Sequence, residues 1–388
     1  MIYVGIDVAK DKHDCSMLDT NGAELYPVFT ISNNREGYDK FFRVITEAEY
    51  DVSKVKVGLE STGHYSYNIL RALADRGYPT FVINPLHTNY YRKAQTLRLT
   101  KTDRVDAHTI AQMLISDNTL DQYCGTSTYD DLKSLTRYMH DMVQNRARMK
   151  ISISRLISIL FPELEKMFST SHSSTVYALL SEMPGASYIA EADIDRIKTL
   201  LIESSRGFFD EDKAISIYNK ARTSIGLDAP AKSLELKHTI KQVEYLSRDI
   251  AETEKAITTI MKEIDSPITT IPGIKYRLGS VILAEAGDFS RFENADKLLA
   301  YAGLSPSTYQ SGQLVSTRSH MEKRGSKYLR YAIFDATRHV CIRSQRFRLY
   351  LEGKRAEGKH YNVAVSHAAK KLVRTIYRME MTGEAYKE

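Results

Sequence analysis

The stretch IYVGIDVAKDKHDCSML, Ile2 to Leu18, decides the fold class, because it predicts two β-strands separated by a short polar connection. Apolar residues alternate along the first strand and define one of its faces, namely Ile2, Val4, Ile6 and Val8. The second strand follows closely, from His13 to Leu18. Because the chain runs straight into a strand, we expect no cleavable signal segment at its start.

Further elements follow in alternation, and Asn21-Gly22 is a hairpin turn signal between the second strand and a third. The predicted elements are a strand over 25–31, a helix around 38–45, a strand over 55–59 that ends at Glu60, a helix over 64–76, a strand over 80–83 and a helix over 103–115. Three strands, helix, strand, helix, strand, helix is the order of an RNase H-like α/β fold.

Four acidic residues fall on the elements that converge at one edge of such a sheet. They are Asp7 on the first strand, Glu60 at the end of the fourth, and Asp103 and Asp106 on the late helix. Asp103 and Asp106 are three residues apart and can both face a metal ion. Four carboxylates repel one another unless a cation lies among them, and hard oxygen ligands favour Mg²⁺ or Mn²⁺. Two ions ~4 Å apart would stabilise the attacking and leaving oxygens of a phosphodiester. The alternative is that each acid only caps or solvates its own element.

Length and composition indicate a globular protein of two or three units, since 388 residues exceed one ordinary domain. The three cysteines, Cys15, Cys124 and Cys341, show no paired spacing, which argues against a disulfide framework and against a thiolate zinc site. A reducing cytoplasm is the expected setting. No apolar run approaches the ~20 residues needed to span a bilayer, so we expect no membrane segment.

Positive charge is concentrated towards the end of the chain. From Arg318 to Arg378 there are sixteen Lys and Arg against four Asp and Glu, an excess of +12 in a chain whose net charge is +6. This polarity predicts contact with a polyanion, although a solvated basic face would have the same composition. The candidate contacts in the basic run are Arg318, Lys323, Arg324, Lys327 and Arg330.

A second basic stretch leads into the acidic pair and interleaves cations with aromatic rings, a pattern suited to phosphate contacts and base stacking. An ordinary exposed helix could look similar. The candidate contacts are Tyr91, Arg92, Lys93, Arg98, Lys101 and Arg104.

The middle of the chain is predicted to be helical. A helix over 129–160 carries apolar residues seven apart, at Leu135, Met142, Met149 and Leu156. The same interval recurs at Leu236, Val243, Ile250, Ile257 and Ile264. Such repeats indicate coiled-coil seams. The segment between them, 170–231, is mostly helical, with breaks at Pro184-Gly185 and Gly226.

Two further motifs lie beyond the middle region. Residues 268–288 predict a helix end, a Pro-Gly turn and a second helix, a helix-hairpin-helix-like element in which Gly273 and Lys275 could contact a phosphate. A glycine needed only for the turn is the equal alternative. The polar loop GLSPSTYQSGQ, 303–313, offers several hydroxyl nucleophiles, and the residue pattern alone does not choose among them.

Taken together, GIDVAKDKHD, ESTGHY, VINPLHTNYYRKA and KTDRVDAHTIA resemble the RuvC-like domain of the DEDD transposases of bacterial insertion sequences, the "one-ten" family, which includes relatives of the Piv DNA invertase. IPGIKYRLGSVILAEAGDFSRF, LLAYAGLSPSTYQSG and EKRGSKYLRYAIFDATRHV resemble its C-terminal transposase domain. The likeness covers almost the whole chain. It implies a RuvC-like catalytic domain over 1–127, a helical coiled-coil region over 128–265 and a mainly α transposase domain over 266–388.

The resemblance also implies residue roles. The four acids of the family map onto Asp7, Glu60, Asp103 and Asp106, and its serine nucleophile, which precedes a glycine, maps onto Ser311. The implied activity is transposition or site-specific recombination through a covalent serine-DNA intermediate, with Mg²⁺ or Mn²⁺ bound. The implied partners are donor and target DNA, a structured noncoding bridge RNA, and further copies of the chain, as a dimer or tetramer.

Two other functions stay open. A RuvC-like Holliday-junction nuclease would cut with metal-activated water and form no covalent bond to serine. A non-catalytic nucleic-acid-binding scaffold would keep the fold but not use the acids.

Overall fold

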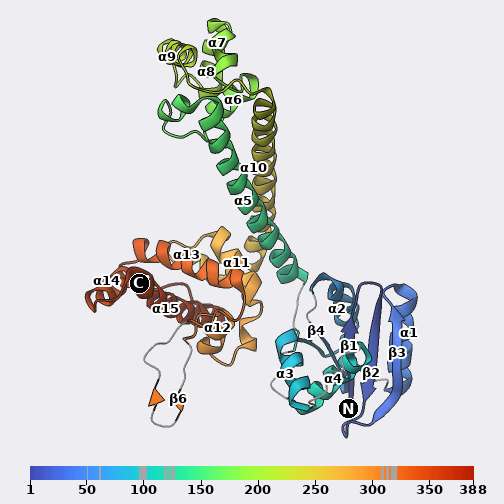
Figure 1. Ribbon diagram of the computed structural model, residues 1–388. Helices are drawn as coiled ribbons and strands as arrows, with labels where there is room; N and C mark the ends of the chain where they lie inside the picture. The colour runs from blue at the N-terminus through green and yellow to red at the C-terminus, as the bar shows by residue number, and fades with distance from the viewer. Residues whose placement is uncertain are drawn as a thin grey trace. The chain divides into compact units, whose positions relative to one another are not determined.

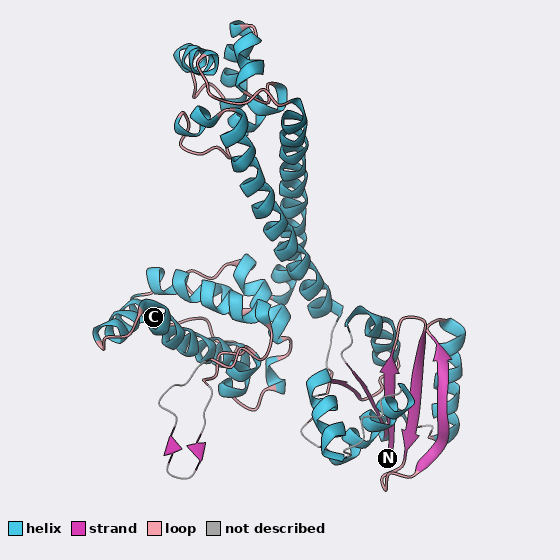
Figure 2. Ribbon diagram, in the orientation of Figure 1, coloured by secondary structure: helices cyan, strands magenta, loops and turns pink. Residues whose placement is uncertain are grey.

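The computed structural model describes residues 1–49, 51–60, 63–95, 103–117, 120, 122–123, 127–306, 310–311, 314–315 and 321–388. The chain forms two compact units, an α/β unit of residues 1–126 with 288–293, and a helical unit of residues 127–287 with 294–388 (Figures 1 and 2). No helix in the described part of the chain is both long enough and apolar enough to cross a bilayer.

The α/β unit is built on a five-stranded sheet in the order β3-β2-β1-β4-β5. Its strands are β1 (Ile2–Val8), β2 (Lys12–Leu18), β3 (Glu24–Ser32), β4 (Val55–Glu60) and β5 (Thr80–Ile83). The first three strands are antiparallel neighbours, whereas β4 and β5 run parallel to β1. All five strands lie where the apolar alternation predicted them, and β5 has the predicted bounds.

Helices cover both faces of this sheet. They are α1 (Arg35–Ala48), α2 (Tyr67–Asp75), α3 (Pro85–Gln95) and α4 (Asp103–Ser116), with single 3₁₀ turns η1 (Val52–Lys54) and η2 (Gly63–Ser66). One core joins the buried side chains of Val4 and Ile6 to Phe41 of α1 and Leu73 of α2. The alternating apolar residues of β1 therefore face α1 and α2, and its intervening residues face the other way.

Helix α4 packs on that opposite face, close against β1 and β4. The approach depends on two glycines that are register partners, Gly5 and Gly58. A Cβ on Gly5 would lie 2.0 Å from the carbonyl oxygen of Ala107, and one on Gly58 would lie 2.9 Å from the Leu114 side chain. Since real Cβ contacts are never that short, α4 can lie this close only over glycine.

The helical unit begins with two long helices, α5 (Ser127–Leu160) and α10 (Pro230–Ile264), which pack against each other (Figure 1). Of the predicted α10 seam, Leu236, Val243, Ile250 and Ile257 are buried, whereas Ile264 is half-buried. On α5, Met142 and Leu156 are buried, whereas Leu135 and Met149 are half-buried. The seven-residue interval thus located the packed side of both helices.

Short helices fill the segment between α5 and α10. They are η3 (Pro162–Lys166), α6 (Ser174–Glu182), α7 (Ala186–Glu191), α8 (Ile194–Ser205) and α9 (Glu211–Arg222). The predicted break at Pro184-Gly185 separates α6 from α7. Gly226 passes so close to α5 that a Cβ there would lie 2.2 Å from the Leu160 carbonyl oxygen. Packing against α5 therefore requires glycine at position 226.

The remaining elements follow α10. They are η4 (Pro267–Thr270), α11 (Tyr276–Ala286), η5 (Phe289–Arg291), α12 (Ala295–Tyr301), β6 (Gln310–Ser311), β7 (Leu314–Val315), α13 (Lys327–Arg343), α14 (Gln345–Ala356) and α15 (Tyr361–Thr382). The segment predicted as a polar loop, 303–313, contains the strand β6, which pairs antiparallel with β7 just after it. The predicted helix before the Pro-Gly turn is only the single turn η4, because α10 already ends at Ile264.

A buried ion pair ties α5 to α11 and α13. Arg137 donates through Nε and Nη2 to the two oxygens of Glu285, at 2.6 and 3.0 Å. The Ser326 hydroxyl, which caps α13, donates to the same carboxylate at 2.7 Å. The Glu285 side chain is buried, which by itself would raise its pKa, but these donors outweigh burial and hold the pKa below its usual value.

Replacing Gly5 with Ala should destabilise the α/β unit by about 2–3 kcal/mol, since α4 must move away from β1 to admit the methyl group. Urea unfolding measures the change. Gly353→Ala on α14 is the matched control, because a Cβ there meets no atom within 4 Å and should change stability by less than about 1 kcal/mol. Equal stability of the two variants would contradict this account of the packing.

Candidate functional site

Two of the predicted acids lie side by side at the end of the sheet. Asp7 and Glu60 directly follow the last register pair of β1 and β4, Ile6 and Leu59. Both are half-buried. Asp7 lies two residues after Gly5, and Glu60 two after Gly58, so both side chains project on the face that α4 covers.

A further acid on the same face was missed from the sequence. Asp14 on β2 is the direct partner of Asp7 in the antiparallel register and is only 4% exposed. Directly opposed residues of antiparallel strands project on the same face. The Asp14 carboxylate accepts hydrogen bonds from the Thr30 hydroxyl and, at 3.3 Å, from the Lys12 ammonium group. Only the pairing register could have identified it, because nothing in the local pattern links Asp14 to Asp7.

Asp106 enters from α4, one residue before Ala107, whose carbonyl lies over Gly5. It is 6% exposed and pairs with Arg92 of α3, whose Nη1 donates to Oδ1 at 2.9 Å. Arg92 Nη2 also donates to the Asn89 side chain at 3.3 Å, which fixes the guanidinium group. A buried carboxylate is thereby neutralised by an arginine of its own domain.

Asp103 is the first residue of α4, and its side chain lies outside what the structure describes. Among the side chains that are described, no three Asp, Glu, His or Cys groups are gathered closely enough to hold a metal ion. Asp7, Glu60 and Asp106 nevertheless belong to one sheet face and the helix packed on it. Their oxygen donors have the chemistry that hard divalent cations prefer.

Some residues of the basic stretch before α4 already have partners within the α/β unit. Tyr91 lies on α3 with its hydroxyl 2.9 Å from that of Ser116, and Arg92 is held by Asp106. Lys93 on α3 and Arg104 on α4 are exposed. The predicted contacts Arg98 and Lys101 lie outside the described residues.

In the helical unit, the Pro-Gly turn has a packing role. A Cβ on Gly273 would lie 2.8 Å from the backbone of His339 on α13, so α13 requires glycine at this position. Lys275 is the exposed residue that precedes α11. It lines a cavity of about 400 Å³ between α5, α11 and α13.

The other predicted cations surround the start of α13. Lys323, Arg324 and Lys327 are exposed, and Arg330 donates to the Lys323 carbonyl oxygen at 3.1 Å. Arg318 lies outside the described residues. Ser311 ends the two-residue strand β6, where it pairs with Leu314 of β7, and its side chain is not among those described.

Acids at the ends of two adjacent strands, on a chain that also carries a basic helical unit, fit an enzyme that acts on nucleic acid. Comparison with known families identifies the class. Residues 4–162 match a family model described as a transposase, and residues 265–352 match one described as the transposase IS116/IS110/IS902 family. The chain belongs to this family of DEDD transposases and is a DNA transposase or site-specific recombinase. Membership implies DNA binding and, in general, dependence on divalent metal ions.

Similar proteins come from several bacteria. The chain is 25% identical to the insertion element IS116 uncharacterized 44.8 kDa protein of Streptomyces clavuligerus, over 97% of this chain and 94% of that protein. It is 23% identical to the pilin gene-inverting protein of Moraxella bovis, over 97% of this chain and 94% of that protein. It is also 23% identical to the insertion element IS900 uncharacterized 42 kDa protein of Mycobacterium paratuberculosis, over 97% of this chain and 95% of that protein.

Arg92→Ala should lower the stability of the α/β unit by about 3 kcal/mol, because it leaves the buried Asp106 carboxylate without its counter-charge. Arg104→Ala removes an equal charge from an exposed position and serves as the control. Urea unfolding at neutral pH measures the free energy of unfolding of both variants. The double variant Arg92→Ala with Asp106→Asn should recover much of the loss, and failure to recover would mean that Arg92 acts through other contacts.

Proposed function

We propose that this transposase cleaves and exchanges DNA strands at a metal-dependent site on an RNase H-like domain, through a covalent serine-DNA intermediate. Asp7, Glu60, Asp103 and Asp106 would hold the metal, and Ser311 would be the nucleophile. The observation that carries the proposal is the placement of Asp7 and Glu60 on one sheet face together with α4, which bears Asp106. Three acids from segments far apart in the sequence share one side of the sheet.

The donor set suits Mg²⁺ or Mn²⁺, because it consists of carboxylate oxygens. A bound divalent ion would supply positive charge for the attacking and leaving oxygens of the phosphodiester. Arg92 already places a cation beside Asp106 and orients its carboxylate. For Asp106 to serve as a ligand, Arg92 would have to share its carboxylate or move from it.

In the proposed step, the Ser311 Oγ forms a bond to the scissile phosphorus while one P–O bond of the DNA strand breaks. The serine proton leaves Oγ, and the released strand end takes up a proton on its oxygen. One phosphodiester replaces another, so the bond energy is retained for rejoining and no ATP is needed. Ser311 ends β6, where its backbone pairs with Leu314 of β7.

The wider proposal covers partners and assembly. Donor and target DNA would be selected by base pairing to a structured noncoding bridge RNA, which leaves the protein to grip backbones. The chain would act in the cytoplasm as a dimer or tetramer, with a catalytic domain over 1–127, a coiled-coil region over 128–265 and a transposase domain over 266–388. Similarity to the pilin gene-inverting protein of Moraxella bovis supports site-specific recombination by this chain.

Ser311→Ala should abolish strand cleavage, by more than about a thousandfold, while DNA binding stays unchanged, because only the nucleophile is lost. A gel assay for covalent protein-DNA adducts, followed by peptide mapping, measures the step. Ser305→Ala, in the same loop segment, is the control and should form the adduct normally. Cleavage retained in Ser311→Ala would favour a junction nuclease that uses metal-activated water.

Asp7→Asn tests the acidic site and separates the enzyme from a non-catalytic scaffold. The amide keeps the shape of the side chain but removes a ligand charge, so strand exchange should fall below detection while nucleic-acid binding persists. Strand exchange is measured with a plasmid that carries donor and target sites. Unchanged exchange would exclude a role for Asp7 in the chemistry.

A further inference from the structure

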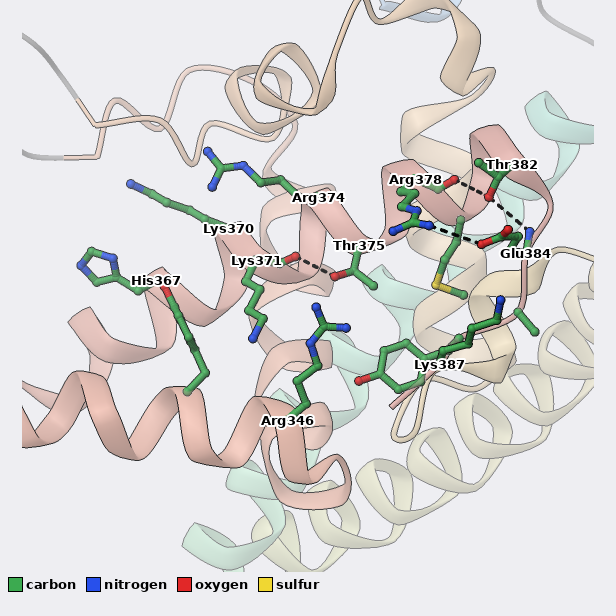
Figure 3. A pocket seen from close by; sticks show the side chains of 14 residues that line it. Arg346, His367, Lys370, Lys371, Arg374, Thr375, Arg378, Thr382, Glu384 and Lys387 are labelled. Atoms are coloured by element: carbon green, nitrogen blue, oxygen red, sulfur yellow. Dashed lines mark hydrogen bonds and ion pairs between the residues drawn. The ribbon is translucent and has the colours of Figure 1, made fainter.

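The helical unit contains a strongly basic pocket within the segment where positive charge is concentrated in the sequence. It has a volume of about 490 Å³ and lies between α14, α15 and the last residues of the chain (Figure 3). Its lining includes six lysines and arginines and one histidine, but a single carboxylate, Glu384. The cations are Arg346, Lys370, Lys371, Arg374, Arg378 and Lys387. Five of them belong to the basic run predicted to contact a polyanion, although none was named as an individual contact.

Two of these cations already have acidic partners. Arg374 pairs with Asp296 at 2.9 Å, and Arg378 pairs with Glu384 at 3.6 Å. In the described part of the chain, no carboxylate lies within ion-pairing distance of Arg346 or Lys371. Figure 3 shows these two side chains pointing towards one another from α14 and α15. Two like charges that face each other across a cavity are stabilised by an anion between them.

The surroundings of Lys371 support this interpretation. Burial, and then the positive charge of Arg346, lower the pKa of the Lys371 ammonium group. Its Nζ also lies 4.6 Å from the centre of the Tyr350 ring and 5.2 Å from that of Phe347. The ammonium group is thus held in place by aromatic rings and repelled by its neighbour, and a bound anion would relieve the repulsion.

The end of the chain forms a fixed wall of the pocket. The Tyr386 hydroxyl lies 3.0 Å from that of Ser344, and its backbone N–H donates to Thr270 Oγ1 at 2.9 Å. A carboxylate oxygen of Glu388 accepts from the backbone N–H of Arg346 at 3.0 Å. Tyr350 and Tyr386, both half-buried, therefore line the cavity beside the cations.

We propose that this pocket binds an unpaired nucleotide of a single-stranded polynucleotide, with its phosphate between Arg346 and Lys371 and its base against Tyr350 or Tyr386. The cavity volume is that of a pocket for one small ligand, whereas a duplex presents its phosphates on a convex surface. Tyrosine rings stack on any exposed base, and cations track the backbone. The inference rests on the proposed handling of nucleic acid, but not on the serine chemistry.

The test uses the full chain and measures binding of a short labelled single strand, as DNA and as RNA of the same sequence, and of the matching DNA duplex. Arg346→Ala and Lys371→Met should each weaken single-strand binding by roughly tenfold. Each should also reduce the slope of log affinity against log salt concentration by about one. Duplex binding should change by less than about twofold. The single strand, DNA or RNA, whose affinity falls more in the pocket variants is the occupant.

Arg355→Ala on α14 is the matched control, since Arg355 is exposed and lies outside the pocket lining. Thermal unfolding in inorganic phosphate, against chloride at equal ionic strength, is the second measurement. Phosphate should stabilise the unmodified chain more than either pocket variant. Single-strand binding equal to that of the control would overturn the proposal, and so would an equal loss for the duplex. Loss of DNA cleavage by Ser311→Ala leaves these measurements unaffected, so the two proposals fail separately.

Discussion

The close approach of α4 to the centre of the sheet is the constraint on which the candidate acidic site depends. Two glycines that are register partners, Gly5 and Gly58, leave room for the backbone of Ala107 and the side chains of Ile110 and Leu114. A larger residue at Gly5 would push the helix backbone outward, and one at Gly58 would displace the Leu114 and Ile110 side chains. The helix would then carry Asp106 away from the face on which Asp7 and Glu60 project. The packing of α4 on these glycines thus determines where its carboxylate lies relative to those of the strands.

Two buried carboxylates, Asp106 and Glu285, and a more accessible pair of cations, Arg346 and Lys371, differ in how their charges are compensated. Asp106 and Glu285 are nearly inaccessible, and each has an arginine of its own unit as a partner. Glu285 adds a hydroxyl donor from Ser326, which satisfies more of its oxygen lone pairs. Arg346 and Lys371, by contrast, face one another with no acid between them in the described part of the chain. Compensated charges maintain the fold, whereas an uncompensated pair is a site for an external anion.

Several glycines that could be mistaken for flexible or ligand-binding positions are explained by packing. Gly226 lies against the Leu160 carbonyl, and Gly273 lies against the backbone of α13. At Gly273 the sequence left a phosphate contact and a steric role as equal alternatives, and the contact with His339 supplies the steric reason. That contact also holds α11 against α13, the two helices that Glu285 and Ser326 connect. The turn therefore contributes to the frame of the helical unit.

By itself, the sequence determined the strands of the sheet, the bounds of α4 to within one residue, and the packed sides of α5 and α10, because each depends on a short apolar period. Family motifs also pointed to the acids and Ser311. Only the tertiary structure decided that Asp14 opposes Asp7, that Arg92 neutralises Asp106, and that Arg346 and Lys371 meet in one pocket. These pairs join residues from different elements. Their proximity depends on strand register and helix packing, which local periodicity does not encode.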